Sequence, residues 1–143
     1  MISIDDMRNI AMAEKAAEEK AKSSKLQKEL TMYRDKLNEK RPMLMEYVQK
    51  RIVFAIKSDK DKAGLYSDNA KSIFEGITCN WYRNLAKEFF RYLWAEGCNP
   101  DSALGIALKE LAADVRTELL EAGIKEIKCG GPSTGGPDVI LVF

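Results

Sequence analysis

The sequence predicts a mainly helical protein of the α+β class, with a long N-terminal helix, a compact helical core and a short C-terminal β-hairpin. Residues 4–41 contain neither proline nor glycine and are rich in strong helix formers. Two later segments place apolar side chains at helical spacing and end at Gly97 and Gly123. Residues 124–129 instead alternate apolar and polar side chains, a cluster of glycine and proline follows, and residues 139–143 are all apolar, which is typical of two strands and a turn.

The first helix should divide into two parts. At about 1.5 Å per residue, a helix over residues 4–41 is longer than a small domain is wide, so part of it must project or find a partner. An apolar stripe at alternating spacings of four and three is interrupted once, by Lys40, and is typical of a seam against another helix. The members of this stripe are Leu26, Leu30, Tyr33, Leu37 and Leu44. We therefore expect a projecting charged helix over residues 1–41 that is solvated at first and coiled-coil-like from residue 26.

Residues 42–123 are expected to form the helical core. Pro42 can start a second helix at its first turn or kink a continuous one. The apolar segment that follows ends in a polar loop over residues 57–64. A further helix should begin at Ser67 or Asp68 and stop before Gly97, and its broadly apolar surface indicates a place at the centre of the core.

The last helix has a clear predicted start. Asn99, Pro100 and Asp101 supply a cap residue, a proline at the first helical position and an acid in the first turn. Its apolar face should end at Gly123. Beyond it we expect the hairpin over residues 124–143, with residues 130–137 as a turn rich in glycine and proline.

The composition restricts the classes of function. The chain of 143 residues has the length of one domain and contains no apolar run that could cross a membrane. Acidic residues stand where a secretory leader would be basic, so we expect a soluble, cytoplasmic protein without a membrane partner. Histidine is absent, which removes histidine-based nucleophiles and imidazole metal sites. The three cysteines, Cys79, Cys98 and Cys129, are widely separated, so neither a disulfide framework nor a zinc knot is expected.

Several weaker patterns in the sequence each have a plain structural explanation. The glycine-rich segment lacks every phosphate-loop signature, and a hairpin turn is the preferred interpretation. Glu126, Lys128 and Asp138 contain the pieces of a metal-dependent nuclease motif, but in reversed order. Arg83, Lys87 and Arg91 form a basic row beside many aromatics, for which core aromatics with a solvated stripe are preferred over base stacking. We therefore expect no catalytic residue, metal or cofactor.

The leading functional hypothesis is a non-catalytic, oligomeric binding or regulatory protein. Its partner would be a second copy or another protein. The partner would be held by helix contacts of the projecting N-terminal helix, and strand addition at residues 139–143 could supply a second contact. The helical contact would use the apolar stripe, and the strand contact would use Val139, Leu141 and Phe143.

Two alternatives remain open. The first is a nucleic-acid-binding accessory protein, because residues 1–62 hold 15 Lys and Arg against 11 Asp and Glu. The bases that would bind the nucleic acid are Lys22, Lys25, Lys28, Arg34, Lys36, Lys40 and Arg41. The second is an enzyme that uses carboxylates or a metal at the C-terminal glycine-rich loop.

Overall fold

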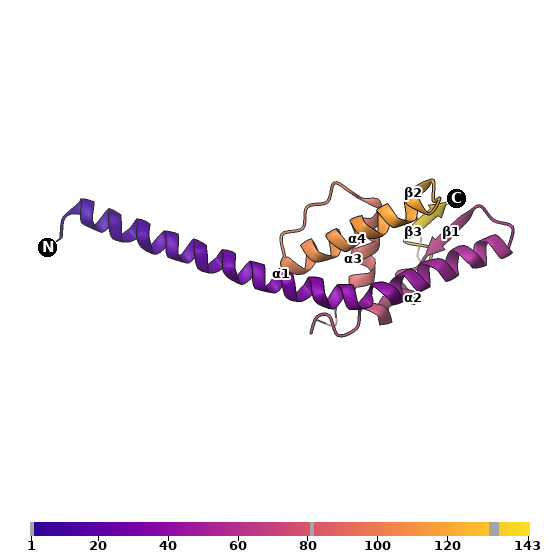
Figure 1. Ribbon diagram of the computed structural model, residues 1–143, viewed down its shortest axis with the longest axis horizontal. Coiled ribbons are helices and arrows are strands. Elements are labelled where there is room, and N and C mark those ends of the chain that lie inside the picture. Colours follow the sequence, from indigo (N-terminus) through magenta and orange to yellow (C-terminus); the bar gives the residue numbers. More distant parts are fainter. Residues whose placement is uncertain (1, 81, 132–134) are drawn as a thin grey trace.

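The computed structural model describes residues 2–80, 82–131 and 135–143, and it confirms a mainly helical fold with a small antiparallel sheet. One very long helix runs past a compact body and continues well beyond it (Figure 1). The elements in chain order are α1 Ile4–Lys57, β1 Lys62–Leu65, α2 Ser67–Ala70, the 3-10 helix η1 Lys71–Phe74, α3 Leu85–Trp94, α4 Ala103–Glu121, β2 Glu126–Cys129 and β3 Val139–Val142.

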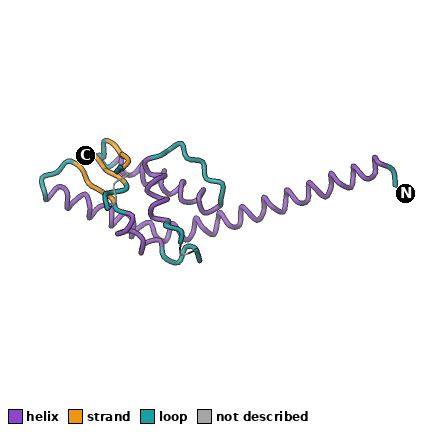
Figure 2. The backbone as a smooth tube through the Cα atoms, turned by 180° about the vertical axis from the view of Figure 1, so that it is seen from behind, coloured by secondary structure: helices purple, strands orange, loops and turns teal. Residues whose placement is uncertain are grey.

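Helix α1 is 54 residues long. The Ser3 hydroxyl accepts a hydrogen bond from the Asp6 N–H at 3.2 Å, and two aspartates lie in the first turn, where negative charge favours a helix start. Every residue from 2 to 28 is exposed, and burial begins at Leu30. We call residues 4–28 the arm. Figure 2 shows the arm leaving the body as a straight extension of the helix that lines it.

Of the two alternatives expected at Pro42, the structure has a continuous helix that runs through the proline. Leu37 and Leu44, on either side of the proline, are both completely buried. Their packing holds the two halves of α1 against the same body, and the lost backbone hydrogen bond is tolerated inside a bent helix. Figure 1 shows the axis of α1 changing direction where it passes the body.

Helix α4 covers the buried stripe of α1. Arg34 pairs with Glu110, and Arg41 pairs with Glu118. Because the residue numbers rise together in both helices, α1 and α4 run parallel. The predicted seam against another helix is therefore formed inside the chain.

The single helix predicted from Ser67 or Asp68 to Ala95 or Glu96 is wrong. The structure has α2, η1 and an irregular stretch before α3. Gly76 takes a φ of +82°, which ends the helical path, and the Asn80 side chain accepts a hydrogen bond from the Tyr82 N–H at 3.1 Å. Asn84 then caps α3 by accepting from the Lys87 N–H at 3.1 Å. Hydrogen bonds to the asparagine side chains thus take the place of helical backbone hydrogen bonds between η1 and α3.

The predicted start of the last helix is also displaced. Helix α4 begins at Ala103, and its N-cap is Ser102, whose hydroxyl accepts from the Gly105 N–H at 3.1 Å. The Asn99 side chain serves another purpose, because its oxygen accepts from the Lys109 ammonium at 3.2 Å. Ser102 therefore caps α4 in place of Asn99, which the sequence predicted as the cap.

The sheet has the order β1-β3-β2, with both pairings antiparallel. The expected hairpin of β2 and β3 is present, and β1 joins it from a segment predicted to be a loop. Val139 and Leu141 of the central strand are completely buried, and Phe89 and Phe90 of α3 are equally buried. Helix α3 thus lies at the centre of the core, as its apolar pattern predicts.

Candidate functional site

The arm is a surface that the body does not cover, because every residue from 4 to 28 is exposed. Ile4, Met7, Ile10 and Met12 are exposed near its tip. An exposed helix of this kind gains little from its own apolar side chains, because helix stability in proteins comes mostly from packing. The arm is therefore a candidate contact surface.

The seam residues predicted to bind a partner lie mostly inside the chain itself. Leu30, Leu37 and Leu44 belong to the core, and Tyr33 is half-buried against it. Leu26, at the base of the arm, keeps 40% of its surface exposed. A helical contact with a partner therefore has Leu26 and the arm available, while the rest of the stripe is occupied by α4.

The predicted strand contact meets a similar constraint. Strand β3 has β1 on one edge and β2 on the other, so both of its edges are already paired. Val139 and Leu141 are buried, and the Phe143 N–H donates to the Asp61 carbonyl at 3.0 Å. Adding a partner strand at residues 139–143 would require removal of β1 or β2, so this contact is not available in the folded chain.

The basic residues proposed for nucleic acid fall into two groups. Arg34 and Arg41 are bound to carboxylates of α4, and the Arg34 hydrogen bonds lower the pKa of Glu110 below its ordinary value despite partial burial. Lys36 and Lys40 are half-buried. The fully exposed members of the set lie together on the arm: Lys22, Lys25 and Lys28.

A cleft of about 500 Å³ lies between α3 and the end of the hairpin. One wall carries Arg83, Lys87, Arg91 and Trp94. The first three are the basic row that was identified in the sequence. Cys129, Gly131 and Asp138 line the other wall. The fold thus brings the basic row beside the glycine-rich segment, although residues 132–134 of that segment lie outside the described chain.

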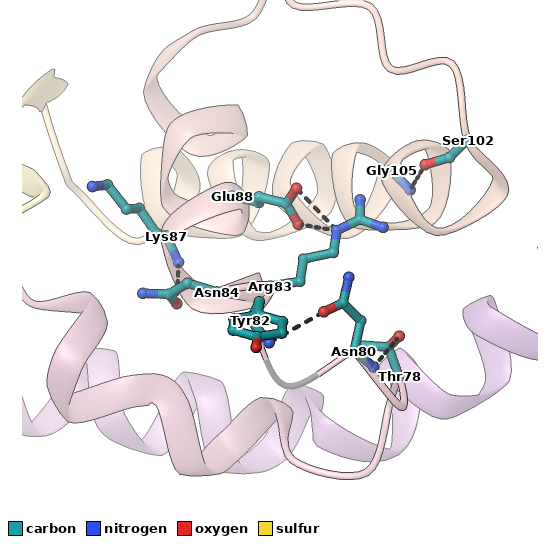
Figure 3. Close-up of polar contacts among 9 residues, drawn as sticks. All are labelled: Thr78, Asn80, Tyr82, Arg83, Asn84, Lys87, Glu88, Ser102 and Gly105. Carbon is teal, nitrogen blue, oxygen red and sulfur yellow. Dashed lines mark hydrogen bonds and ion pairs between the residues drawn. The ribbon is translucent and has the colours of Figure 1, made fainter.

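The cleft's acidic side chains are held by other groups. Both carboxylate oxygens of Glu88 accept from the Arg83 Nε, at 3.0 and 2.9 Å (Figure 3). The Asp138 Oδ2 accepts from the Ser67 N–H at 2.7 Å. Figure 3 shows the Lys87 amino group directed away from the Arg83–Glu88 pair. The basic row is therefore only partly neutralised within the cleft.

The chain was compared with protein-family models, curated proteins and solved structures. No family model, curated protein or solved structure matches it.

The carboxylate-enzyme alternative gains no geometric support in the described part of the chain. No group of three Asp, Glu or Cys side chains there is placed to hold a metal ion. Glu126 and Lys128 pair with each other at 3.5 Å, and Asp138 is committed to Ser67. Within the same residues, no helix is both long and apolar enough to span a bilayer.

The sequence located the basic row but missed its opposite wall. The spacing of Arg83, Lys87 and Arg91 by four residues predicts one helix face; Lys87 and Arg91 do share a face of α3, whereas Arg83 precedes that helix. Their proximity to Cys129 and Asp138 depends on how the hairpin docks on α3. No signal within either segment predicts that docking.

Proposed function

We propose that this protein is a non-catalytic, oligomeric binding protein whose arm pairs with the arm of a second copy. The supporting observation is the combination of full exposure and segregated charge along the arm. Residues 2–19 carry five carboxylates against two cations, a net charge of −3. Residues 20–28 carry four lysines and no acid, a net charge of +4.

This charge pattern favours an antiparallel pair. When two fully overlapping arms run in opposite directions, the four lysines of residues 20–28 in each arm lie beside residues 4–12 of the other, which carry Asp5 and Asp6 against Arg8. A parallel pair would instead place like charges side by side, which is destabilising on a helix surface. A second copy of this chain is thus a better electrostatic match for the arm than a uniformly charged partner.

The geometry leaves room for such a pair. The arm is about 37 Å long at 1.5 Å per residue. In an antiparallel pair, each body lies beyond the tip of the other arm, so the two bodies do not collide. The product would be two bodies joined by a two-helix shaft.

We propose that the apolar contact uses the outer side of the arm, opposite the side that carries Leu26 and Leu30. At about 100° per residue, Ile10 and Ala21 lie opposite the core-facing Leu30 on α1, with Ala17 on the same outer side. Ile10 is 49% exposed. The small alanines allow two helices to approach closely, and Ile10 contributes the larger apolar area. Pairing therefore stabilises the dimer by apolar burial as well as by charge.

A charge-swap experiment tests this pairing. One variant carries Lys20→Glu, Lys22→Glu and Lys25→Glu, and the other carries Glu14→Lys, Glu18→Lys and Glu19→Lys. Each variant alone should be monomeric by sedimentation, because its arms then bear charge of one sign throughout most of their length. An equimolar mixture should restore a dimer. A mixture that remains monomeric would contradict arm pairing.

A matched pair of substitutions tests the apolar face. Ile10→Gln should weaken dimerisation, because it removes a large apolar side chain from the outer face. Met12→Gln is the control, because Met12 is also exposed but lies on the other side of the helix. Equal effects of the two substitutions would argue against a specific outer face.

A further inference from the structure

The cleft beside α3 has the size of a small-molecule site. Its volume of about 500 Å³ lies within the range of about 300–1,000 Å³ found for ligand pockets. It combines charged, aromatic and backbone groups from two segments that are distant in sequence. Such a combination can distinguish one ligand chemistry from another.

The uncompensated charge of the cleft is positive. Glu88 pairs with Arg83, and Asp138 accepts from the Ser67 N–H but keeps its charge, so the lining carries three cations against two carboxylates. Lys87 and Arg91 have no carboxylate within 4.0 Å in the part of the chain that the structure describes. They lie four residues apart, which places their Cβ atoms about 6 Å from each other on one helix face. Two neighbouring cations in this arrangement can hold one anionic group between them.

Trp94 extends this row with a flat apolar surface. It follows Arg91 by three residues, lines the same cleft and is 38% exposed. Along the helix axis, Lys87 and Trp94 are separated by about 10 Å. The cleft thus offers cations at one end and an aromatic ring at the other. An aromatic ring of this kind stacks on the π-face of any nucleobase.

We propose that this cleft binds a nucleotide, with Lys87 and Arg91 holding its phosphate and Trp94 stacking on its base. Charge-assisted hydrogen bonds to phosphate oxygens would supply affinity, and the indole would select for a ring. The nucleotide is either a free nucleoside diphosphate or one unit of a single strand, because both present the same phosphate and base. This site is separate from the arm and does not depend on dimerisation.

Calorimetric titration of the full chain tests the proposal. The probes are adenosine diphosphate, adenosine, inorganic phosphate and a short single-stranded oligonucleotide. Adenosine diphosphate should bind more tightly than either adenosine or phosphate, because only it engages both ends of the cleft. Tighter binding of the oligonucleotide, lost in the same variants, would identify a single strand as the natural source of the nucleotide.

The variants separate the cleft from general surface charge. The double substitution Lys87→Gln with Arg91→Gln should weaken binding at least about tenfold, because it removes two charge-assisted contacts. Lys57→Gln with Lys60→Gln changes the net charge equally at exposed positions outside the cleft, and it should leave binding unchanged. Trp94→Leu should weaken binding of the nucleotide but not of phosphate. Absence of binding by every probe, or equal effects of the two double variants, would overturn the proposal.

Discussion

Arg34 of α1 donates two hydrogen bonds of 2.7 Å to Glu110 of α4, one from Nε to Oε2 and one from Nη2 to Oε1. One heptad further along α1, Arg41 reaches Glu118 at 2.8 Å. These pairs set the register between the two parallel helices. Because α1 extends far beyond the start of α4, its N-terminal residues are left as the exposed arm.

The Arg34–Glu110 pair should make stability depend on pH. The pKa of Glu110 is below its ordinary value in the folded chain, mainly through the Arg34 hydrogen bonds, and returns to the ordinary value on unfolding. The contribution to stability is therefore present above the ordinary glutamate pKa and is lost as the pH falls through the folded pKa. Glu110→Gln should be less stable than the native chain at about pH 7, and the difference should shrink at about pH 3, below the ordinary glutamate pKa.

Urea unfolding at both pH values checks this expectation. Both side chains of the pair are more than one-third exposed, so the effect should be small. Glu121→Gln is a suitable control, because Glu121 has no ion pair within the described residues. A deficit of Glu110→Gln that stays the same at both pH values would refute an ionic role for this contact.

Leu37 and Leu26 should respond very differently to truncation. Leu37 is 1% exposed, and Leu37→Ala should cost about 2–5 kcal/mol of unfolding free energy through lost burial and a residual cavity. Leu26 is much more exposed, and Leu26→Ala should change that free energy by less than about 0.5 kcal/mol. Denaturant unfolding of each variant at low protein concentration provides the measurement. Similar losses for both would mean that the arm packs on the body.

Gly130 should tolerate no side chain. A Cβ atom at this position would lie 1.7 Å from the Pro137 carbonyl oxygen, which belongs to the backbone and cannot move aside alone. Gly130→Ala should therefore cost at least the about 1–3 kcal/mol typical of overpacking and should disturb the β2–β3 pairing. Gly97→Ala is the control, since no atom lies within 4 Å of its Cβ position. Thermal unfolding of the two variants should differ clearly, and equal melting temperatures would contradict this close approach.

Local patterns in the sequence predicted much of the helical architecture. The stripe from Leu26 to Leu44 marked the side of α1 that packs against a helix. It could not identify that helix as α4, because heptad spacing reports a helical neighbour and not its origin. The spacing of Leu30, Leu37 and Leu44 predicts that they pack against a helix, but it does not predict that this helix belongs to a partner.

The sequence did not predict the structure that depends on contacts between distant segments. Strand β1 contains Lys62 and Gly64 and has no strong strand pattern, and it is extended because it pairs with β3 across more than seventy residues of chain. Ile73, Phe74 and Ile77 are buried without belonging to a long α-helix. Their spacing satisfied the helical period, but Gly76 broke the path. Apolar periodicity therefore predicted burial better than conformation.

Sedimentation equilibrium measures whether the arm joins two copies of the chain. The full chain should show twice its monomer mass of 16.1 kDa, with dissociation on dilution. A chain lacking residues 2–25 should be monomeric and should unfold with the same free energy per monomer, because those residues are exposed in the folded chain. A full chain that stays monomeric at every concentration, or a shortened chain that still dimerises, would contradict arm pairing.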